Sequence, residues 1–454
     1  QIAFVSLFFV VCVCVCDPSS AYKYTGVVCR LTYPAAAVLN EKTTKVIEAA
    51  FQHARYPSMQ GEKSAGFFGK VSYGLENLEI YNLSIGRSDF ELRPGEGIGL
   101  EINNVSAVFS GTILYGYGSW LLDFEVETQI DLGINPKLYC GNSKVAADTS
   151  DCYLNFHKFR LYLEGDKEPN WLKKLFTDFI TFTVKLVVKG QICKEINKLA
   201  DILAEFIQDT AADFLSDGGI SVDIGVTTTP LITANYIESY HKGLTTYLNL
   251  TSVINASVFL PDHLTENRML YFWFSGGLIF KPLIAAAHQD GRFQLNISSE
   301  ELKTLFETNL SSIKPEYVEK CLLGSASPEL RAWSSSIPTL NTSTVGTSVW
   351  AQATGELYCG SRSKPVLSFQ TVHRGIFHRV LKFEFIREAV EKIGVPKVLS
   401  VLEVEITRLM DKQGANLFDI IDPEVLHQEG YIVTRMDFGF PHHLLVDFLK
   451  RTLQ

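Results

Sequence analysis

Apolar and polar residues alternate along one part of the chain and recur at helical spacing along another. From 69 to about 163, short alternating runs are broken by glycine and asparagine, which predicts antiparallel strands joined in hairpins. The glycine-dense stretch 95–99 lies among these strands and predicts a hairpin turn. Before them, a short strand is expected at 27–31 and an amphipathic helix at 34–54. From 171 to 214, apolar residues recur every three or four positions without proline, which predicts a long helix packed along the sheet.

The second half of the chain repeats this order of elements. A strand is predicted at 269–274 and a short helix near 283–287. A second helix begins after Ser298, which has the capping-box spacing to Glu301. The remaining predicted elements of this half are strands within 328–385 and at 402–406 and a short helix at 386–394, and a strand at 221–226 precedes this half. Together these patterns predict an α+β fold of two similar halves joined by a sheet.

The chain opens with an apolar stretch that differs from everything after it. Residues 2–16 are too few to span a membrane and are followed at once by small polar residues, so we expect 1–19 to be a signal peptide. The initiator methionine and a basic segment are missing, so the sequence is expected to begin inside this signal. No later stretch offers about 18 uncharged apolar residues. We therefore expect a secreted, soluble mature chain.

A short amphipathic helix is predicted over 441–454, at the other end of the sequence. At about 100° per residue, one broad arc of this helix is apolar and the narrow remainder is polar. The apolar arc holds Leu444, Leu445, Phe448 and Leu449. Asp447 lies on the polar arc. Such a helix suits a lipid surface or an apolar groove, and the alternative is that it docks on the core of its own protein.

Composition narrows the classes of partner. The chain has 41 basic and 50 acidic residues and a net charge of -9, which disfavours nucleic acid.

Three cysteines, Cys12, Cys14 and Cys16, lie in or beside the signal and do not indicate a metal site. The six others are far apart, which in an oxidising compartment indicates one or two disulfides. Candidate glycan acceptors in N-x-S/T triplets are Asn82, Asn104, Asn249, Asn255, Asn296, Asn309 and Asn341, and we expect glycans at Asn104 and Asn249.

The sequence lacks the motifs of common catalytic and metal sites. No serine has glycine both two residues before and two residues after it, so the nucleophile elbow of a lipase is missing. The histidines show no H-E-x-x-H spacing, and the other histidine pairs do not favour a shared metal. The stretch 95–99 also lacks the spacing of a dinucleotide fingerprint. We therefore expect neither an enzyme nor a metal site.

Four segments, at 26–40, 151–197, 268–275 and 418–449, resemble the family that includes bactericidal/permeability-increasing protein and lipopolysaccharide-binding protein. Within the last of them, the stretch DFGFPHHLLVDFL is the most specific. The resemblance implies an elongated boomerang of two barrels, with long wrapping helices, a central antiparallel sheet and a continuous hydrophobic lipid tunnel. It implies cholesteryl ester, triglyceride and phospholipid as bound lipids, and no other cofactor.

The same resemblance implies a secreted plasma monomer that exchanges cholesteryl ester and triglyceride between lipoproteins. High-density, low-density and very-low-density particles would be its partners, through peripheral contact with their lipid monolayers. A tunnel lowers the barrier because an ester in water exposes hundreds of square ångströms of apolar surface, at about 25 cal/mol per Å². The alternative is recognition of lipopolysaccharide or phospholipid on the same fold, which the acidic net charge and the terminal helix oppose.

The resemblance also assigns roles to individual residues. It pairs Cys152 with Cys193 in a disulfide between a barrel strand and the long helix. It places three polar residues at the neck of the tunnel, where they orient an ester: Gln208, Ser239 and His241. Thr210 and Tyr240 depart from the family pattern there. The terminal helix would cap a tunnel opening, with Leu444, Leu445, Phe448 and Leu449 toward lipid and Asp447 toward solvent.

These predictions divide the chain into five parts. They are a truncated signal peptide at 1–19, an N-terminal barrel with the long helix at 20–216, a central sheet and linker at 217–266, a C-terminal barrel with returning central strands at 267–440, and the amphipathic helix at 441–454. Between about 325 and 385 the family pattern is lost, and the second barrel is expected to be short by several strands. A lost or misread exon is the favoured explanation, and a genuinely reduced barrel is the alternative.

Overall fold

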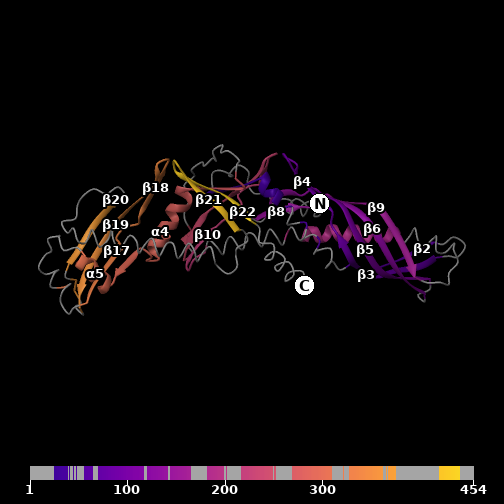
Figure 1. Cartoon of the computed structure of the whole chain (residues 1–454), viewed down its shortest axis with the longest axis horizontal. Coiled ribbons are helices and arrows are strands. Elements are labelled where there is room, and N and C mark those ends of the chain that lie inside the picture. Colours follow the sequence, from indigo (N-terminus) through magenta and orange to yellow (C-terminus); the bar gives the residue numbers. More distant parts are fainter. Residues whose placement is uncertain are drawn as a thin grey trace, which may run out of the picture.

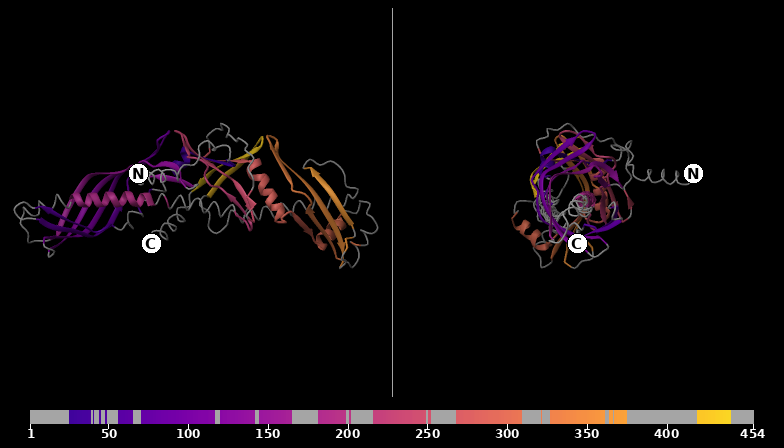
Figure 2. Two further views of the ribbon diagram at one scale, coloured as in Figure 1. Left: turned by 180° about the vertical axis from the view of Figure 1, so that it is seen from behind. Right: turned by 90° about the vertical axis from the view of Figure 1, so that its right-hand side faces the viewer.

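The computed structural model shows an elongated arrangement of sheets, with few helices among the residues that it describes (Figure 1). A central sheet lies between two end sheets, which curl into half-barrels (Figure 2). The structure describes residues 25–38, 40, 44, 48, 56–64, 70–116, 120–141, 144–164, 181–198, 201, 216–248, 250–251, 268–308, 321, 327–360, 364–365, 367–374 and 419–439. The predicted helix 386–394 and strand 402–406 lie outside these residues.

The first end sheet contains the hairpins predicted between 69 and 163. Its order is β2-β3-β5-β6-β9, with β4 paired to β5, and the predicted turn at 95–99 joins β4 to β5. Phe109 of β5 pairs with Val126 of β6, and both are fully buried. The strands are β2 (Met59–Ser64), β3 (Lys70–Ser84), β4 (Arg87–Arg93), β5 (Gly97–Gly116), β6 (Trp120–Ile134) and β9 (Cys152–Glu164), and a separate hairpin is formed by β7 (Lys137–Gly141) and β8 (Lys144–Asp148).

Two helical segments belong to this half of the chain. Residues 33–38 are helical directly after β1, and residues 181–198 are helical within the long helix predicted from the sequence. Val184, Val188 and Ile192 of the second segment lie in the same buried core as Phe109. The apolar face of this segment is therefore covered by the first end sheet, as its helical periodicity predicts.

The central sheet brings together strands from distant parts of the chain. Its order is β11-β12-β1-β15-β22-β21, and all its pairs are antiparallel. The strand β1 lies at its centre, between β12 and β15, although its residues fall within the range proposed for the first barrel. The strands are β1 (Val27–Thr32), β11 (Leu231–Ile232), β12 (Tyr236–His241), β15 (Leu270–Ser275), β21 (Asp419–Gln428) and β22 (Tyr431–Gly439).

The second end sheet has the order β16-β17-β19-β18, with β20 paired to β19. The helix α5 begins as its capping box predicts, because the Ser298 amide and hydroxyl both donate to the Glu301 carboxylate at 2.8 Å. A π-helical turn before α4 was not predicted from the sequence. The elements here are η3 (Gly276–Phe280), α4 (Lys281–Gln289), α5 (Ser299–Thr308), β16 (Gln294–Ile297), β17 (Pro328–Ser334), β18 (Thr339–Ser343), β19 (Gly346–Cys359) and β20 (Leu367–Arg374), and a small sheet is formed by β10 (Ile220–Asp223), β13 (Leu244–Tyr247) and β14 (Leu250–Thr251).

Candidate functional site

The two faces of the central sheet differ in how tightly they are packed. On one face, Val28, Trp273 and Val433 are completely buried. Successive residues of a strand point to opposite faces, so the neighbours of these residues form the other face. There five apolar side chains are only partly buried, although Val27 and Met436 on the same face are buried. We call these five side chains the apolar face: Leu31, Ile237, Leu270, Phe272 and Phe274. Partly buried, contiguous apolar surface at the centre of an elongated protein is a candidate binding surface.

The rings on the apolar face lie against one another. Phe272 and Phe274 are stacked with centroids 5.9 Å apart, and Phe274 lies 6.2 Å from Phe280 of the π-helical turn. Leu31 pairs in register with both Ile237 and Leu270, which extends the same surface across three strands. The surface is therefore continuous from β12 to β15.

A pair of polar side chains interrupts the apolar face on β12. The Ser239 hydroxyl lies 2.8 Å from His241 Nε2, and His241 Nδ1 lies 2.9 Å from the Ile224 carbonyl oxygen. A carbonyl oxygen only accepts hydrogen bonds, so Nδ1 carries the ring proton and donates it. In the neutral ring, Nε2 therefore accepts from the Ser239 hydroxyl.

A serine hydrogen-bonded to a histidine is also part of a hydrolase triad. In a triad a carboxylate orients the histidine, whereas here a backbone carbonyl does so. A hydrolase also needs N–H groups aimed at an oxyanion, and β12 commits its backbone to β1 and β11. The Ser239–His241 pair is thus better suited to hydrogen bonding than to nucleophilic attack.

Burial lowers the pKa of His241 below the ordinary value of 6.5, and the hydrogen bond to Ile224 opposes this shift. We expect the imidazole to stay neutral in the folded protein at pH values where an exposed histidine is protonated. The unfolded chain binds that proton first, so the contribution of His241 to stability is present above pH 6.5 and is lost as the pH falls through the folded pKa. An NMR titration of the ring measures this pKa, and a midpoint at or above 6.5 contradicts the prediction.

Cys29 lies beside this pair, opposite Ser239 in the register of β1 and β12. It carries a free thiol. Burial raises the pKa of that thiol to about 12, although a hydrogen bond to Ser239 opposes the shift. The thiol is therefore neutral at physiological pH, and the polar spot on the apolar face has no net charge.

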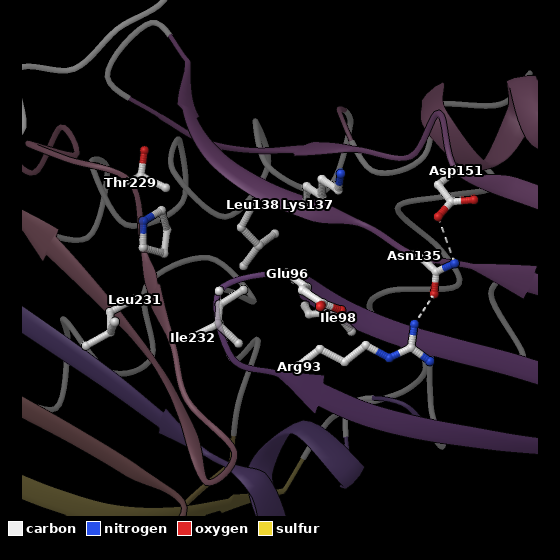
Figure 3. A pocket seen from close by; sticks show the side chains of 13 residues that line it. Arg93, Glu96, Ile98, Asn135, Lys137, Leu138, Asp151, Thr229, Leu231 and Ile232 are labelled. Atoms are coloured by element: carbon white, nitrogen blue, oxygen red, sulfur yellow. Dashed lines mark hydrogen bonds between the residues drawn. The ribbon is translucent and has the colours of Figure 1, made fainter.

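A separate cavity of about 620 Å³ lies between the first end sheet and the edge strand β11 (Figure 3). On one wall, Arg93 donates to Asn135 at 2.7 Å, and Asn135 donates to Asp151 at 3.0 Å (Figure 3). Lys137 and Glu96 add further charge to the lining. Burying these charges against an apolar ligand is unfavourable, so this cavity does not suit a neutral lipid.

The structure places some of the residues singled out from the sequence and not others. Ser239 and His241 are in direct contact, and Cys152 and Cys193 form a disulfide. Asn104 is exposed on β5, where its backbone N–H donates to the Asp131 carboxylate. The others lie outside the described residues: Gln208, Asn249, Leu444, Leu445, Asp447, Phe448 and Leu449.

Three features of the described structure were not predicted from the sequence: the orientation of Tyr240, the pairing of the second disulfide and the cavity beside β11. Tyr240 points to the face of β12 opposite His241, where its hydroxyl donates to Glu238 at 2.5 Å. Although Tyr240 departs from the family pattern, it therefore does not change the polarity of the apolar face. Cys321 and Cys359 form a second disulfide. The cavity beside β11 has no signal in the sequence, because its walls come from three distant segments.

The described residues contain neither a candidate metal cluster nor a candidate membrane-spanning helix. No group of three or more histidine, cysteine, aspartate or glutamate side chains could hold a metal ion there. No helix in the described part of the chain is both long and apolar enough to cross a membrane.

Comparison with known proteins defines the class of the protein. The model of the LBP / BPI / CETP family, N-terminal domain, matches residues 37–223. Relatives 39–40% identical align with at least 95% of the chain and at least 94% of their own length. The chain therefore belongs to the LBP/BPI/CETP family, and the family resemblance found in the sequence is confirmed.

Within the family, the chain is similar to cholesteryl ester transfer protein of Homo sapiens, with 40% identity over 96% of both chains, and of Gallus gallus, with 39% identity over 95% of this chain and 94% of the relative. The human alignment spans 475 positions, more than the 454 residues of the chain, so that relative has residues with no counterpart here. Human lipopolysaccharide-binding protein is 22% identical over 62% of this chain and 60% of its own. A crystal structure of lipopolysaccharide binding protein aligns with a TM-score of 0.49 at 16% identity, covering 92% of this chain and 99% of that one.

Proposed function

We propose that this protein is a secreted, non-enzymatic carrier that exchanges cholesteryl ester and triglyceride, together with phospholipid, between lipoproteins. The observation that carries the proposal is the 39–40% identity to cholesteryl ester transfer proteins along almost the entire chain. The relatives that bind lipopolysaccharide by name are only 22–23% identical and align with about 60% of the chain. Neutral-lipid transfer is therefore the better supported activity.

The apolar face of the central sheet supports a lipid passage through the middle of the protein. His241 and Cys29 are deep enough for burial to shift their pKa values, yet both side chains remain partly accessible. In the proposed boomerang, the apolar face forms part of the wall of a tunnel that continues into both barrels, with phospholipids at its openings.

In this proposal the polar pair on β12 orients the ester group of the cargo. The Ser239 hydroxyl can turn from His241 Nε2 and donate to an ester carbonyl, while the uncharged His241 and Cys29 avoid the desolvation penalty of a charge. Gln208 would join them. The terminal helix 441–454 would cap an opening with its apolar arc, and glycans would occupy Asn104 and Asn249.

Transfer of labelled cholesteryl ester from high-density to low-density lipoproteins tests this function. We expect the full chain to transfer the ester and a chain ending at Phe440 to lose most of the rate, because an opening then lacks its apolar cap. Lys450→Gln is the matched control, since it keeps the apolar arc and removes one charge from the polar arc.

Two outcomes would contradict the proposal. A secreted, folded full chain that transfers no ester but binds lipopolysaccharide would favour the recognition function of the more distant relatives. Covalent labelling of a serine by a fluorophosphonate probe, with release of fatty acid from the ester, would indicate a hydrolase instead of a carrier.

A further inference from the structure

The helical segment 181–198 has one face that the protein covers and one that it leaves open. Val184, Val187, Val188, Ile192 and Ile196 are buried in the core of the first end sheet. The disulfide between Cys193 and Cys152 fastens the same segment to β9. The helix is therefore held in a fixed orientation, with its other face toward the surroundings of the protein.

Two large apolar side chains lie on the open face. Phe182 is 65% exposed and Leu186 is 51% exposed, and they are four residues apart, so they are neighbours on adjacent turns. Single exposed apolar residues are common on protein surfaces, but an adjacent pair forms a patch. At about 100° per residue, Lys189 and Gly190 share the arc of this pair, and both are exposed.

The charge of this segment is opposite to that of the whole chain. It holds four lysines and one acid, a formal charge of +3, in a protein of net charge -9. The acid, Glu195, accepts a hydrogen bond from Gln191 at 2.9 Å. Lys185 lies over the Phe156 and Phe159 rings of β9, at 5.4 and 5.1 Å, on one side of the apolar pair.

Lys194 lies on the side of the helix away from Lys185 and is exposed. Lys198 is also exposed but lies about 140° round the helix from the apolar pair, so it does not belong to this face. The apolar pair is thus flanked by cations on both sides. A helix with exposed apolar residues flanked by lysines is the pattern of an interfacial segment, in which the apolar side chains enter the acyl region and the ammonium groups meet phosphates.

We propose that this face, Phe182, Leu186, Lys189 and Lys194, is a docking surface for a phospholipid monolayer that contains anionic lipid. The proposal rests on the proposed function for the identity of the physiological surface and names the part of the protein that contacts it. Charge complementarity favours this occupant. A second copy of the chain in a two-fold dimer would bring the same positively charged face against itself, which is repulsive.

Flotation of the full chain with vesicles of phosphatidylcholine, and of phosphatidylcholine mixed with phosphatidylserine, tests the surface. We expect tighter binding to the mixed vesicles and weaker binding at high salt. Lys189→Gln/Lys194→Gln should weaken binding to mixed vesicles about thirtyfold, at about 1 kcal/mol for each lysine, and should leave binding to pure phosphatidylcholine nearly unchanged. Phe182→Ser/Leu186→Ser should weaken binding to both vesicles by at least about tenfold.

Matched controls carry the same substitutions elsewhere. Lys281→Gln/Lys364→Gln removes two exposed lysines, and Ile337→Ser/Val345→Ser removes two exposed apolar side chains near the second end sheet. Equal binding by the helix variants and these controls would overturn the proposal. So would a helix variant that alters self-association while vesicle binding stays the same.

The inference and the proposed function fail in different ways. If the full chain transfers no cholesteryl ester but binds mixed vesicles through the helix, the docking surface stands and the carrier function does not. If the chain transfers ester and the helix variants transfer and bind as well as the parent chain, the carrier function stands and this surface is wrong.

Discussion

Glu238→Ala is expected to lower the free energy of unfolding by about 3–5 kcal/mol, because it leaves the buried Arg30 charge without its partner. Arg30 Nε and Nη2 donate to one oxygen of Glu238, at 2.9 and 2.7 Å, and both side chains are almost fully buried. The guanidinium also lies 4.1 Å from the centre of the Tyr236 ring and 4.8 Å from the centre of the Trp273 ring, so the charge is packed against two aromatic side chains. Urea unfolding followed by circular dichroism measures the change.

A pair of the same chemistry on the surface is the matched control. Arg331 donates to both oxygens of Glu329, at 3.0 and 2.9 Å, on the second end sheet, but both side chains are substantially exposed. Glu329→Ala should therefore change stability by less than about 1 kcal/mol. Arg30→Met/Glu238→Leu should recover part of the loss, since it removes both charges from the core but also removes the carboxylate that accepts from the buried Tyr240 hydroxyl. A small effect of Glu238→Ala would show that Arg30 is not held in a dry site.

The elements with a local signal could be predicted from the sequence. The β4–β5 turn follows from its glycines, and α5 follows from the capping pair Ser298 and Glu301. The strand β15 follows from the run of aromatic residues at 271–274. In each case the interactions that form the element lie within a few residues of one another, and sequence patterns record such interactions directly.

The central sheet and the buried pair could not be predicted in this way. Arg30 and Glu238 are 208 positions apart, and a charged residue on an alternating strand predicts a solvent-facing position. The pairing of β1 with β12 and β15 depends on tertiary packing, and no periodic pattern in the sequence indicates which strands pair. Ser239 and His241 could be named only through the family resemblance, and their mutual hydrogen bond appears only once β12 is known to be a strand.

The sequence also could not show which face of the long helix is covered. Its periodicity predicts one buried stripe, and the residues of that stripe do pack against the first end sheet. Phe182 and Leu186 are as apolar as the buried residues, so hydrophobicity alone assigns them to the core as well. Their exposure follows from the position of the helix beside β9, which depends on tertiary packing and on the disulfide.

Cys152→Ala/Cys193→Ala is expected to lower the free energy of unfolding by about 4 kcal/mol. The bond joins positions 41 residues apart, and the loss of a cross-link of this span increases the entropy of the unfolded chain by roughly that amount. Both sulfurs also pack against the core of the first end sheet. Cys29→Ala is the matched control, because it removes a partly buried cysteine that forms no disulfide.

This disulfide can stabilise the protein by holding the helix in the folded state or by lowering the entropy of the unfolded chain. Hydrogen exchange distinguishes the two effects, because it shows which segment unfolds locally first. β9 is the last strand in the order of the first end sheet, and the disulfide fastens the helix 181–198 to it. If the bond holds the helix in the folded protein, hydrogen exchange in 181–198 should become faster in the double variant well before global unfolding. If it acts only on the unfolded chain, the stability falls while exchange from the helix stays as slow as from β5 and β6. A double variant that loses less than about 1 kcal/mol and keeps slow exchange would contradict both effects.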